Sequence, residues 1–215
     1  MKNNVFINLL SLSGVIGVVF YFLHVTLGAR FYEGYNPMAQ AISDLTASNS
    51  PSKGIAMVFS ILYGIFTVIF SIYFFVHFKQ KINIPVTFGA GLLSIMTIVS
   101  FFGYTFFPLS ESGYAGTFQD KMHILVTIAA VCLTVIALIL FIIGFFGSEN
   151  LKYPGILSLI TFLLLLVGVV LMRNLPKEYF GIAERINVYS ILMYIGILLL
   201  WMYIYTKEVN LWKTR

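Results

Sequence analysis

Ionisable and nucleophilic side chains gather near the ends of a few apolar segments of this sequence. Asp120 and His123 are three residues apart, a spacing that places both on one face of a helix. Ser43 and Asp44 belong to a polar stretch between two apolar segments. An aspartate–histidine pair beside a serine is suited to general-base or nucleophilic hydrolysis of an ester. The catalytic candidates are therefore His123, Asp120, Asp44 and Ser43.

A second set of side chains is suited to binding without chemistry. Arginine holds anionic groups through charge-assisted hydrogen bonds, and buried histidine or tyrosine adds further polar contacts. The ligand-binding candidates are His24, Arg185, Glu184, Tyr104 and Arg30. Two histidines with one or two carboxylates could also bind Zn²⁺ or a similar ion. The spacing matches no compact metal motif, so the sequence does not indicate which metal or cofactor, if any, the protein binds.

Each candidate also has a structural interpretation. Asp120 is suited to the first turn of a helix, where a negative charge is favourable. His123 could hydrogen-bond a neighbouring helix, and Glu184 could pair with Arg185. The distribution of the groups favours a shared site, because two of the three histidines and six of the eight acids fall on one predicted side of the chain.

The composition identifies the class of protein. The 215 residues are 60% hydrophobic and only 10% charged, whereas soluble domains carry about 25% charged residues. A helix needs roughly 20 apolar residues to span a membrane. We therefore predict an all-α, polytopic membrane protein, a six-helix bundle that forms one integral membrane domain over residues 1–215. The predicted spans are about 5–27, 54–77, 85–107, 121–146, 154–172 and 187–206.

The charges predict how the spans are oriented. The net charge of +5 does not indicate a nucleic-acid partner, because the basic residues are scattered between apolar spans. The terminal segments with the second and fourth connections carry seven basic and two acidic residues, and the other connections carry six of each. Because basic residues are retained on the cytoplasmic side, we expect both termini in the cytoplasm and the protein in the cell membrane.

The longest polar interruption, residues 35–52, then lies in the first outer connection. Asn36 and Pro37 are residue types of a helix N-cap and first turn. Apolar residues follow at the spacing of one helical face: Met38, Ile42 and Leu45. We predict a short interfacial helix here, which carries Ser43 and Asp44 over the end of the bundle.

Four short motifs carry a family resemblance. They are AISDLTASNSPS after the first span, FPLS after the third, DKMH at the start of the fourth and GIAERI before the sixth. With these motifs the whole chain resembles the bacterial and archaeal membrane proteins called domain of unknown function 998 (DUF998). The resemblance implies no particular activity, and its motif positions here are Ser43, Asp44, His123 and Arg185. The acid that usually follows FP has only Glu111 as a counterpart.

The chain is more distantly similar to the eukaryotic Frag1/DRAM/Sfk1 group of six-helix proteins. That group shares an ISD-type segment followed by proline, and a histidine at the start of the fourth helix. Some members are linked to lipid-anchor remodelling and lipid-kinase regulation, so the resemblance implies membrane lipids as partners. The expected function is recognition of a lipid or amphiphile in a polar pocket at the outer face, with hydrolysis or transfer as a further option. A small transporter or channel, and a non-catalytic scaffold or sensor, are the alternatives.

Overall fold

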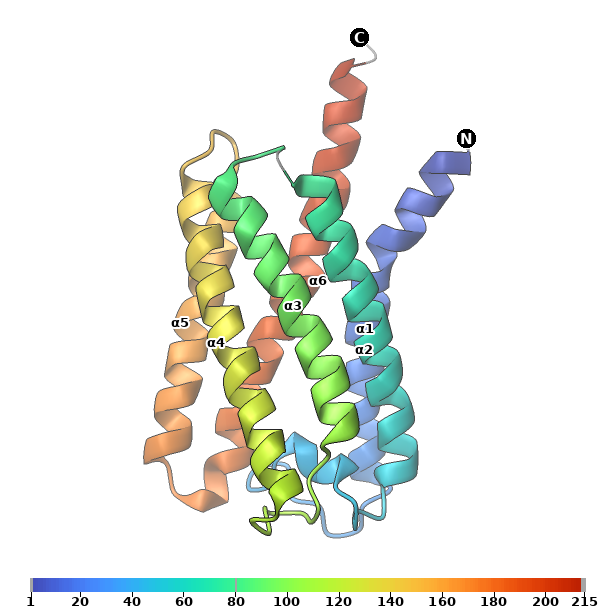
Figure 1. Ribbon diagram of the computed structural model, residues 1–215, viewed down its shortest axis with the longest axis vertical. Helices are drawn as coiled ribbons and strands as arrows, with labels where there is room; N and C mark the ends of the chain where they lie inside the picture. Colours follow the sequence, from blue (N-terminus) through green and yellow to red (C-terminus); the bar gives the residue numbers. More distant parts are fainter. Residues whose placement is uncertain (1, 80, 214–215) are drawn as a thin grey trace.

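The computed structural model of the chain describes the backbone of residues 2–79 and 81–213, and the side chains of residues 10, 12–79 and 81–201. These residues form helices joined by turns and loops, and no strand occurs among them. The long helices run up and down in one bundle (Figure 1). In chain order the elements are α1 (Lys2–Arg30), η1 (Ile42–Thr46), α2 (Lys53–Phe78), α3 (Ile84–Phe106), α4 (Phe118–Phe146), α5 (Lys152–Asn174), η2 (Lys177–Tyr179) and α6 (Phe180–Lys213).

The bundle presents an apolar outer surface. Each of the six long helices contains a window that is long and apolar enough to cross a membrane, and only 28% to 44% of the residues in these windows are buried in the bundle. On α3, for example, Ile84 is 73% exposed and Phe88 is 65% exposed. Lipid removes the cost of exposing such a surface to water. The chain is therefore a multi-pass membrane protein with the predicted six-helix bundle.

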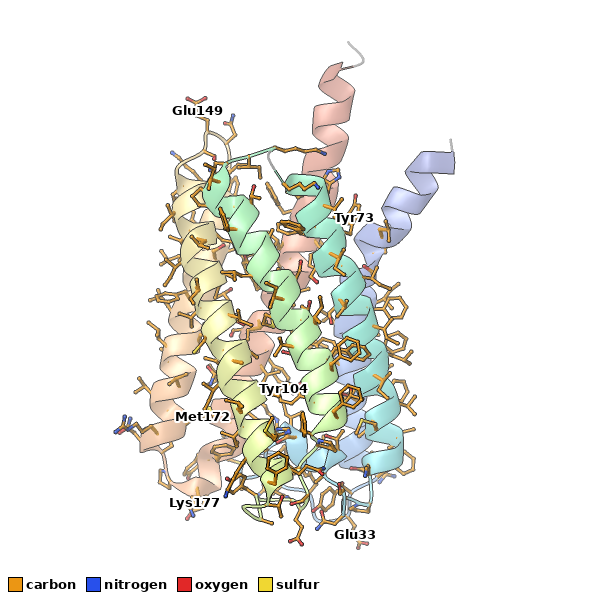
Figure 2. The ribbon with its side chains drawn as sticks, in the orientation of Figure 1. Glu33, Tyr73, Tyr104, Glu149, Met172 and Lys177 are labelled. Carbon is orange, nitrogen blue, oxygen red and sulfur yellow. The ribbon has the colours of Figure 1, made fainter. Side chains whose placement is uncertain are left out.

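The two ends of the bundle differ. The α1–α2, α3–α4 and α5–α6 connections lie at one end, here called the loop-1 end (Figure 1). The start of α1, the end of α6 and the two short remaining connections lie at the other, here called the terminal end. Figure 2 shows Glu33 and Lys177 at the loop-1 end and Glu149 at the terminal end. Most site candidates therefore lie in these connections or in the helix turns near them, at one end of the bundle.

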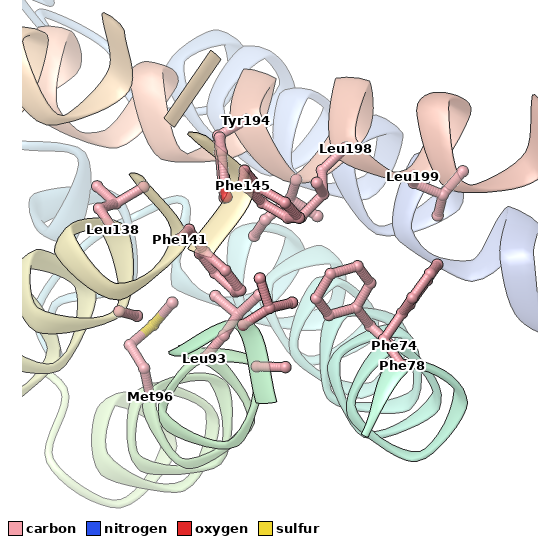
Figure 3. Close-up of a cluster of buried hydrophobic side chains, with 14 of the residues drawn as sticks. Phe74, Phe78, Leu93, Met96, Leu138, Phe141, Phe145, Tyr194, Leu198 and Leu199 are labelled. Carbon is pink, nitrogen blue, oxygen red and sulfur yellow. The ribbon is translucent and has the colours of Figure 1, made fainter. Parts of the chain in front are cut away.

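Aromatic side chains fill the half of the bundle nearer the terminal end. Phe74 and Phe78 of α2 and Phe141 and Phe145 of α4 are almost completely buried together with Leu198 of α6 (Figure 3). Phe74 and Phe141 meet edge to face with ring centroids 6.0 Å apart, an arrangement that aromatic pairs favour. The buried histidines and aspartates lie outside this core.

Small and hydroxylated residues allow the helices to pack closely, as their helical spacing predicts. A Cβ atom added at Gly64 of α2 would collide with the ring of Phe101 of α3. The hydroxyls of Ser71 and Thr97 join the same two helices at 2.7 Å. Gly64 and Ser71 therefore serve packing between α2 and α3.

Side-chain caps form at the starts of two helices. Asn83 accepts a hydrogen bond from the Val86 amide at 3.0 Å and donates one to the Gly144 carbonyl at 2.7 Å. Thr117 and Asp120 form a capping box at the start of α4. Side-chain caps satisfy the free amides of a first helical turn, so these boundaries follow from short-range sequence.

The start of α6 differs from the prediction. α6 begins at Phe180, not near residue 187, so Glu184 and Arg185 lie inside the helix and not before it. The Ile182 amide, which lacks a partner within the helix, donates to the Met38 carbonyl at 3.1 Å. A distant segment thus accepts the hydrogen bond of an amide in the first turn of α6. Local hydropathy does not reveal this contact.

The short helix predicted after Asn36 is also shorter than expected. Only η1, a single 3-10 turn, is helical, and residues 37–40 form turns. The Asn36 side chain accepts from the Met38 amide at 3.0 Å, and the Gln40 side chain accepts from the Asn36 amide at 2.7 Å. Such local hydrogen bonds compete with helix formation. The apolar residues Ile42 and Leu45 of η1 are buried against the bundle.

Candidate functional site

The connection between α1 and α2, called loop 1 (residues 31–52), is fastened to the start of α6. The Ile42 amide donates to the Glu184 carboxylate at 2.6 Å, across 142 residues of sequence. The Ile182 amide donates to the Met38 carbonyl in the opposite direction. Loop 1 therefore closes the end of the bundle as a packed segment.

Arg185 makes a second set of contacts between α6 and loop 1. Its guanidinium donates to the carbonyls of Gln40 and Gly181 at 3.0 and 2.9 Å, and to the Tyr35 hydroxyl at 2.6 Å. The Tyr35 hydroxyl donates in turn to the Ala41 carbonyl at 2.8 Å. Burial raises the pKa of Tyr35 to about 12, although the charge of Arg185 opposes that rise. The phenol thus stays neutral while it accepts from the guanidinium.

Asp44 fastens loop 1 to the α3–α4 connection. Its carboxylate accepts from the amides of Gly113 at 2.9 Å and Ala41 at 3.2 Å, and the side chain is only 3% exposed. Burial raises the pKa of Asp44, whereas the two amides and the charges of Arg185 and His123 lower it. Gly113 has φ +83°, a left-handed conformation that glycine adopts without strain.

Two further candidates lie apart from these contacts. Ser43, next to Asp44, is partly exposed, and its hydroxyl forms no hydrogen bond with the described residues. Arg30 is exposed at the end of α1 and likewise makes no side-chain hydrogen bond within the described part of the chain. Neither residue joins the groups that fasten loop 1.

The two membrane-embedded histidines are held in the same way. Nδ1 of His24 lies 2.9 Å from the Ala56 carbonyl, and Nδ1 of His123 lies 2.8 Å from the Phe107 carbonyl. A carbonyl only accepts, so Nδ1 carries the proton and Nε2 of the neutral ring is an acceptor. Both side chains are buried, at 4% and 6% exposed.

Tyrosine rings lie beside both histidines. Tyr21 lies 4.8 Å from Tyr63 and 5.4 Å from His24, ring to ring, and Tyr104 lies 4.9 Å from His123. Tyr104 lies in the loop-1 half of the bundle (Figure 2). The name interior cluster is used below for Tyr21, His24, Tyr63, Tyr104 and His123.

Asp120 lies outside the interior cluster. Its carboxylate accepts from the amide and hydroxyl of Ser110, at 2.7 and 2.9 Å, and from the amide of Thr117 at 3.0 Å. No hydrogen bond joins Asp120 to His123, whose Nδ1 is taken by the Phe107 carbonyl. The predicted catalytic pair therefore lacks the contact through which the aspartate would orient the imidazole.

Asn187 is a further buried polar residue, one turn along α6 from Glu184. Its side-chain amide donates to the sulfur of Met172 at 3.1 Å, while its Oδ1 is the one fully buried side-chain polar atom without a partner among the described residues. Asn187 packs against Gly168 of α5, where a Cβ would collide with it.

Asn187, Tyr21 and Tyr63 are not among the site residues predicted from the sequence. The spacing of Tyr21 and His24, three residues apart on α1, could have indicated Tyr21 as a neighbour of His24, because residues at that spacing share one helix face. Asn187 follows Glu184 at the same spacing. No comparable spacing indicates Tyr63, because it stands among apolar residues.

A groove of about 520 Å³ runs along the outside of the bundle between α5 and α6. Its walls are mostly apolar, and Arg185 lies toward its loop-1 end. It is lined by Leu157, Ile160, Thr161, Leu164, Ile182, Arg185, Ile186, Tyr189, Ser190, Met193, Tyr194 and Ile197. The same arginine therefore contacts loop 1 and borders an apolar groove.

Comparison with protein families covers most of the chain. The family model described as "Protein of unknown function (DUF998)" matches residues 15–201 of the chain. The chain belongs to the DUF998 family. The predicted membership is thereby confirmed, and no curated protein and no solved structure matches the chain.

Metal binding by this DUF998 protein finds no support in the arrangement of its side chains. Within the described residues, no three histidine, cysteine, aspartate or glutamate side chains lie close enough to hold one metal ion. Structural and catalytic zinc sites use three or four such ligands. The polar groups of this DUF998 protein are instead arranged for hydrogen bonding beside an apolar groove.

Proposed function

We propose that this protein binds a membrane amphiphile, with an apolar chain in the α5–α6 groove and an anionic head group at Arg185. The observation that carries the proposal is the position of Arg185 at one end of an otherwise mostly apolar groove. Amphiphiles combine these two properties, and ligand pockets of about 300–1,000 Å³ have this apolar lining with few polar groups.

The length of the groove supports a lipid tail as its occupant. Arg185 and Ile197 line the groove 12 residues apart on α6, which corresponds to about 18 Å along a helix. Half of the hydrocarbon core of a bilayer is about 15 Å thick. The groove therefore has the length of a tail that belongs to one leaflet.

The hydrogen bonding of Arg185 supports an anionic head group. A guanidinium has five N–H donors, and three of them are used by Gln40, Gly181 and Tyr35. Two donors remain without a partner among the described residues. Arginine commonly holds phosphate and carboxylate groups with such paired donors, and the contacts to loop 1 already orient the side chain.

We further propose that the loop-1 end faces outward from the cell membrane and that both termini are cytoplasmic. The charge distribution along the sequence supports this orientation. The amphiphile would then come from the outer leaflet. The proposal covers recognition of the amphiphile and does not include its hydrolysis or transfer, because Asp120 and His123 do not form a hydrogen-bonded pair.

The test measures lipid retained by the purified full-length protein. Met193→Trp places a large ring in the groove, at a side chain that is 52% exposed, and should lower retained lipid severalfold. Ile143→Trp, at a side chain of α4 that is 56% exposed, is the matched control and should retain lipid as the wild type does. Arg185→Gln should abolish a preference for anionic over neutral lipids. Equal lipid retention by both tryptophan variants would refute the proposal.

A further inference from the structure

The first turn of α6 is shaped to receive loop 1. Gly181 is buried there, and a Cβ atom added to it would lie 2.5 Å from the carbonyl oxygens of both Pro37 and Gln40. Glycine therefore permits an approach of the loop-1 backbone that a residue with a side chain would prevent. Because of this approach, the Gln40 carbonyl accepts from Nη1 of Arg185, one turn further along α6, at 3.0 Å.

The hydroxyl of Tyr35 links the guanidinium of Arg185 to the next residue of loop 1. It accepts from Nη2 of Arg185 at 2.6 Å and donates to the Ala41 carbonyl at 2.8 Å. Arg185 thus contacts the backbone of two consecutive loop-1 residues, Gln40 directly and Ala41 through Tyr35. The conformation of this arginine and the conformation of loop 1 therefore depend on each other.

These contacts leave the free donors of Arg185 on defined nitrogens. Nη1 donates to the carbonyls of Gln40 and Gly181, and Nη2 donates once, to Tyr35. Nε–H and the second hydrogen of Nη2 therefore have no hydrogen-bond partner among the described residues. An arginine without such contacts would have to be ordered by its ligand, at a cost in affinity. In this protein, loop 1 orders the side chain before a ligand binds.

We propose that Tyr35 is a positioning residue for the anionic head group: it orients Arg185 at the end of the α5–α6 groove and so couples occupation of the groove to the order of loop 1. This role rests on the proposed binding of an amphiphile in the groove. The head group and Tyr35 use different hydrogens of one guanidinium, so both are bound at once. Each favours the same conformation of Arg185, which makes the coupling positive, and coupling between two sites is reciprocal.

The first test compares two tyrosine hydroxyls at the loop-1 end. Tyr35→Phe removes the hydroxyl that accepts from Arg185 and keeps the aromatic ring beside the guanidinium. Tyr179→Phe, the control, removes a hydroxyl from a side chain of η2 that is 41% exposed. The full-length proteins are incubated with equal amounts of phosphatidylglycerol and phosphatidylcholine in mixed micelles, and the ratio of the two lipids retained after purification is measured. A loss of folded protein lowers both lipids alike and leaves this ratio unchanged.

We expect Tyr35→Phe to lower the ratio of phosphatidylglycerol to phosphatidylcholine about two- to tenfold, the effect of one long side chain that the ligand must order. Tyr179→Phe should keep the wild-type ratio. A wild-type ratio in Tyr35→Phe, together with a lost preference in Arg185→Gln, would overturn the role of Tyr35 and leave amphiphile binding intact. A wild-type ratio in Arg185→Gln would overturn both.

A glycine substitution tests the same coupling without a change to Tyr35 or Arg185. The added Cβ of Gly181→Ala would displace the two loop-1 carbonyls that lie against this residue, so this variant should also lower the lipid ratio. Gly54→Ala, in the first turn of α2, is the matched control, because no atom lies within 4 Å of its added Cβ. A wild-type ratio in Gly181→Ala would show that the fit of loop 1 does not orient the arginine, and would overturn the coupling.

Hydrogen exchange measures the coupling in the opposite direction. In the wild type, the amides of residues 40–42 should exchange severalfold more slowly in nanodiscs that contain phosphatidylglycerol than in nanodiscs of phosphatidylcholine alone. Because coupling is reciprocal, this difference should shrink in Tyr35→Phe and Gly181→Ala and persist in the two controls. A Tyr35 that only stabilised loop 1 would change exchange equally in both lipids. That result, or equal exchange of the wild type in both lipids, would overturn the proposal.

Discussion

Arg185 of α6 donates a hydrogen bond of 2.6 Å to the hydroxyl of Tyr35, 150 residues earlier in the chain. The guanidinium also lies over the Tyr35 ring, with its Cζ 5.8 Å from the ring centroid. One side chain thus joins loop 1 to the start of α6 through hydrogen bonds and a cation–π contact. The same side chain borders the groove between α5 and α6.

Replacement of Arg185 by lysine should loosen loop 1. Lysine keeps the charge, but its compact ammonium lacks the planar fork that reaches Gln40, Gly181 and Tyr35 together. Hydrogen exchange of the amides of residues 35–42 should become about ten- to a hundredfold faster, as for the loss of one hydrogen bond to a charged group. Arg30→Lys, at an exposed position, is the control. Equal protection in both variants would contradict the role given to Arg185.

Asp44 should make stability depend on pH. Burial raises the pKa of its carboxyl above the ordinary value of 3.8, so the folded protein holds this proton more tightly than the unfolded chain. The contribution of Asp44 to stability therefore decreases as the pH rises from about 4 through the folded-state pKa, and stays constant above it.

Asp44→Asn should remove this part of the pH dependence. Melting temperatures in detergent between about pH 4 and 7 would measure it, with Glu33→Gln in the same loop as an exposed control. We expect a flatter profile for Asp44→Asn and an unchanged profile for Glu33→Gln. A profile for Asp44→Asn that parallels the wild type would show that Asp44 is not the titrating group.

Asp120 should act as a structural residue at the start of α4. Asp120→Ala leaves the amides of Ser110 and Thr117 without their acceptor and should lower the free energy of unfolding by about 1–3 kcal/mol. Glu111→Ala, at an exposed side chain in the same connection, should change it by less than about 0.5 kcal/mol. Chemical denaturation in mixed micelles compares the two, and similar stabilities would argue against the capping role.

The close approach of α2 and α3 predicts opposite effects of two glycine substitutions. Gly64→Ala would bring a methyl group onto the Phe101 ring, and such overpacking should cost about 1–3 kcal/mol. No atom lies within 4 Å of a Cβ at Gly54, in the first turn of the same helix. Gly54→Ala should therefore be neutral or stabilise by up to about 1 kcal/mol. Melting temperatures of the two variants measure the difference, and a Gly64→Ala variant as stable as Gly54→Ala would contradict the packing.

Much of the fold follows from the sequence alone. Whether a segment of roughly 20 residues crosses a membrane depends on its own composition, and caps such as Asn83 and Thr117 act within three residues. For this reason the six helices and most of their boundaries were predictable, whereas the family was indicated by its resemblance in four short motifs. Charge counts likewise predict an orientation in the membrane.

The arrangement of the candidate site depends on tertiary structure. The contacts of Glu184 with Ile42 and of Arg185 with Tyr35 join residues 142 and 150 positions apart, and nothing local to either partner specifies the other. Sequence spacing suggested a pair between Asp120 and His123, but each group found a nearer partner in the α3–α4 connection. Which helices become neighbours determines which polar atoms are paired, and so determines that Oδ1 of Asn187 is buried without a partner among the described residues.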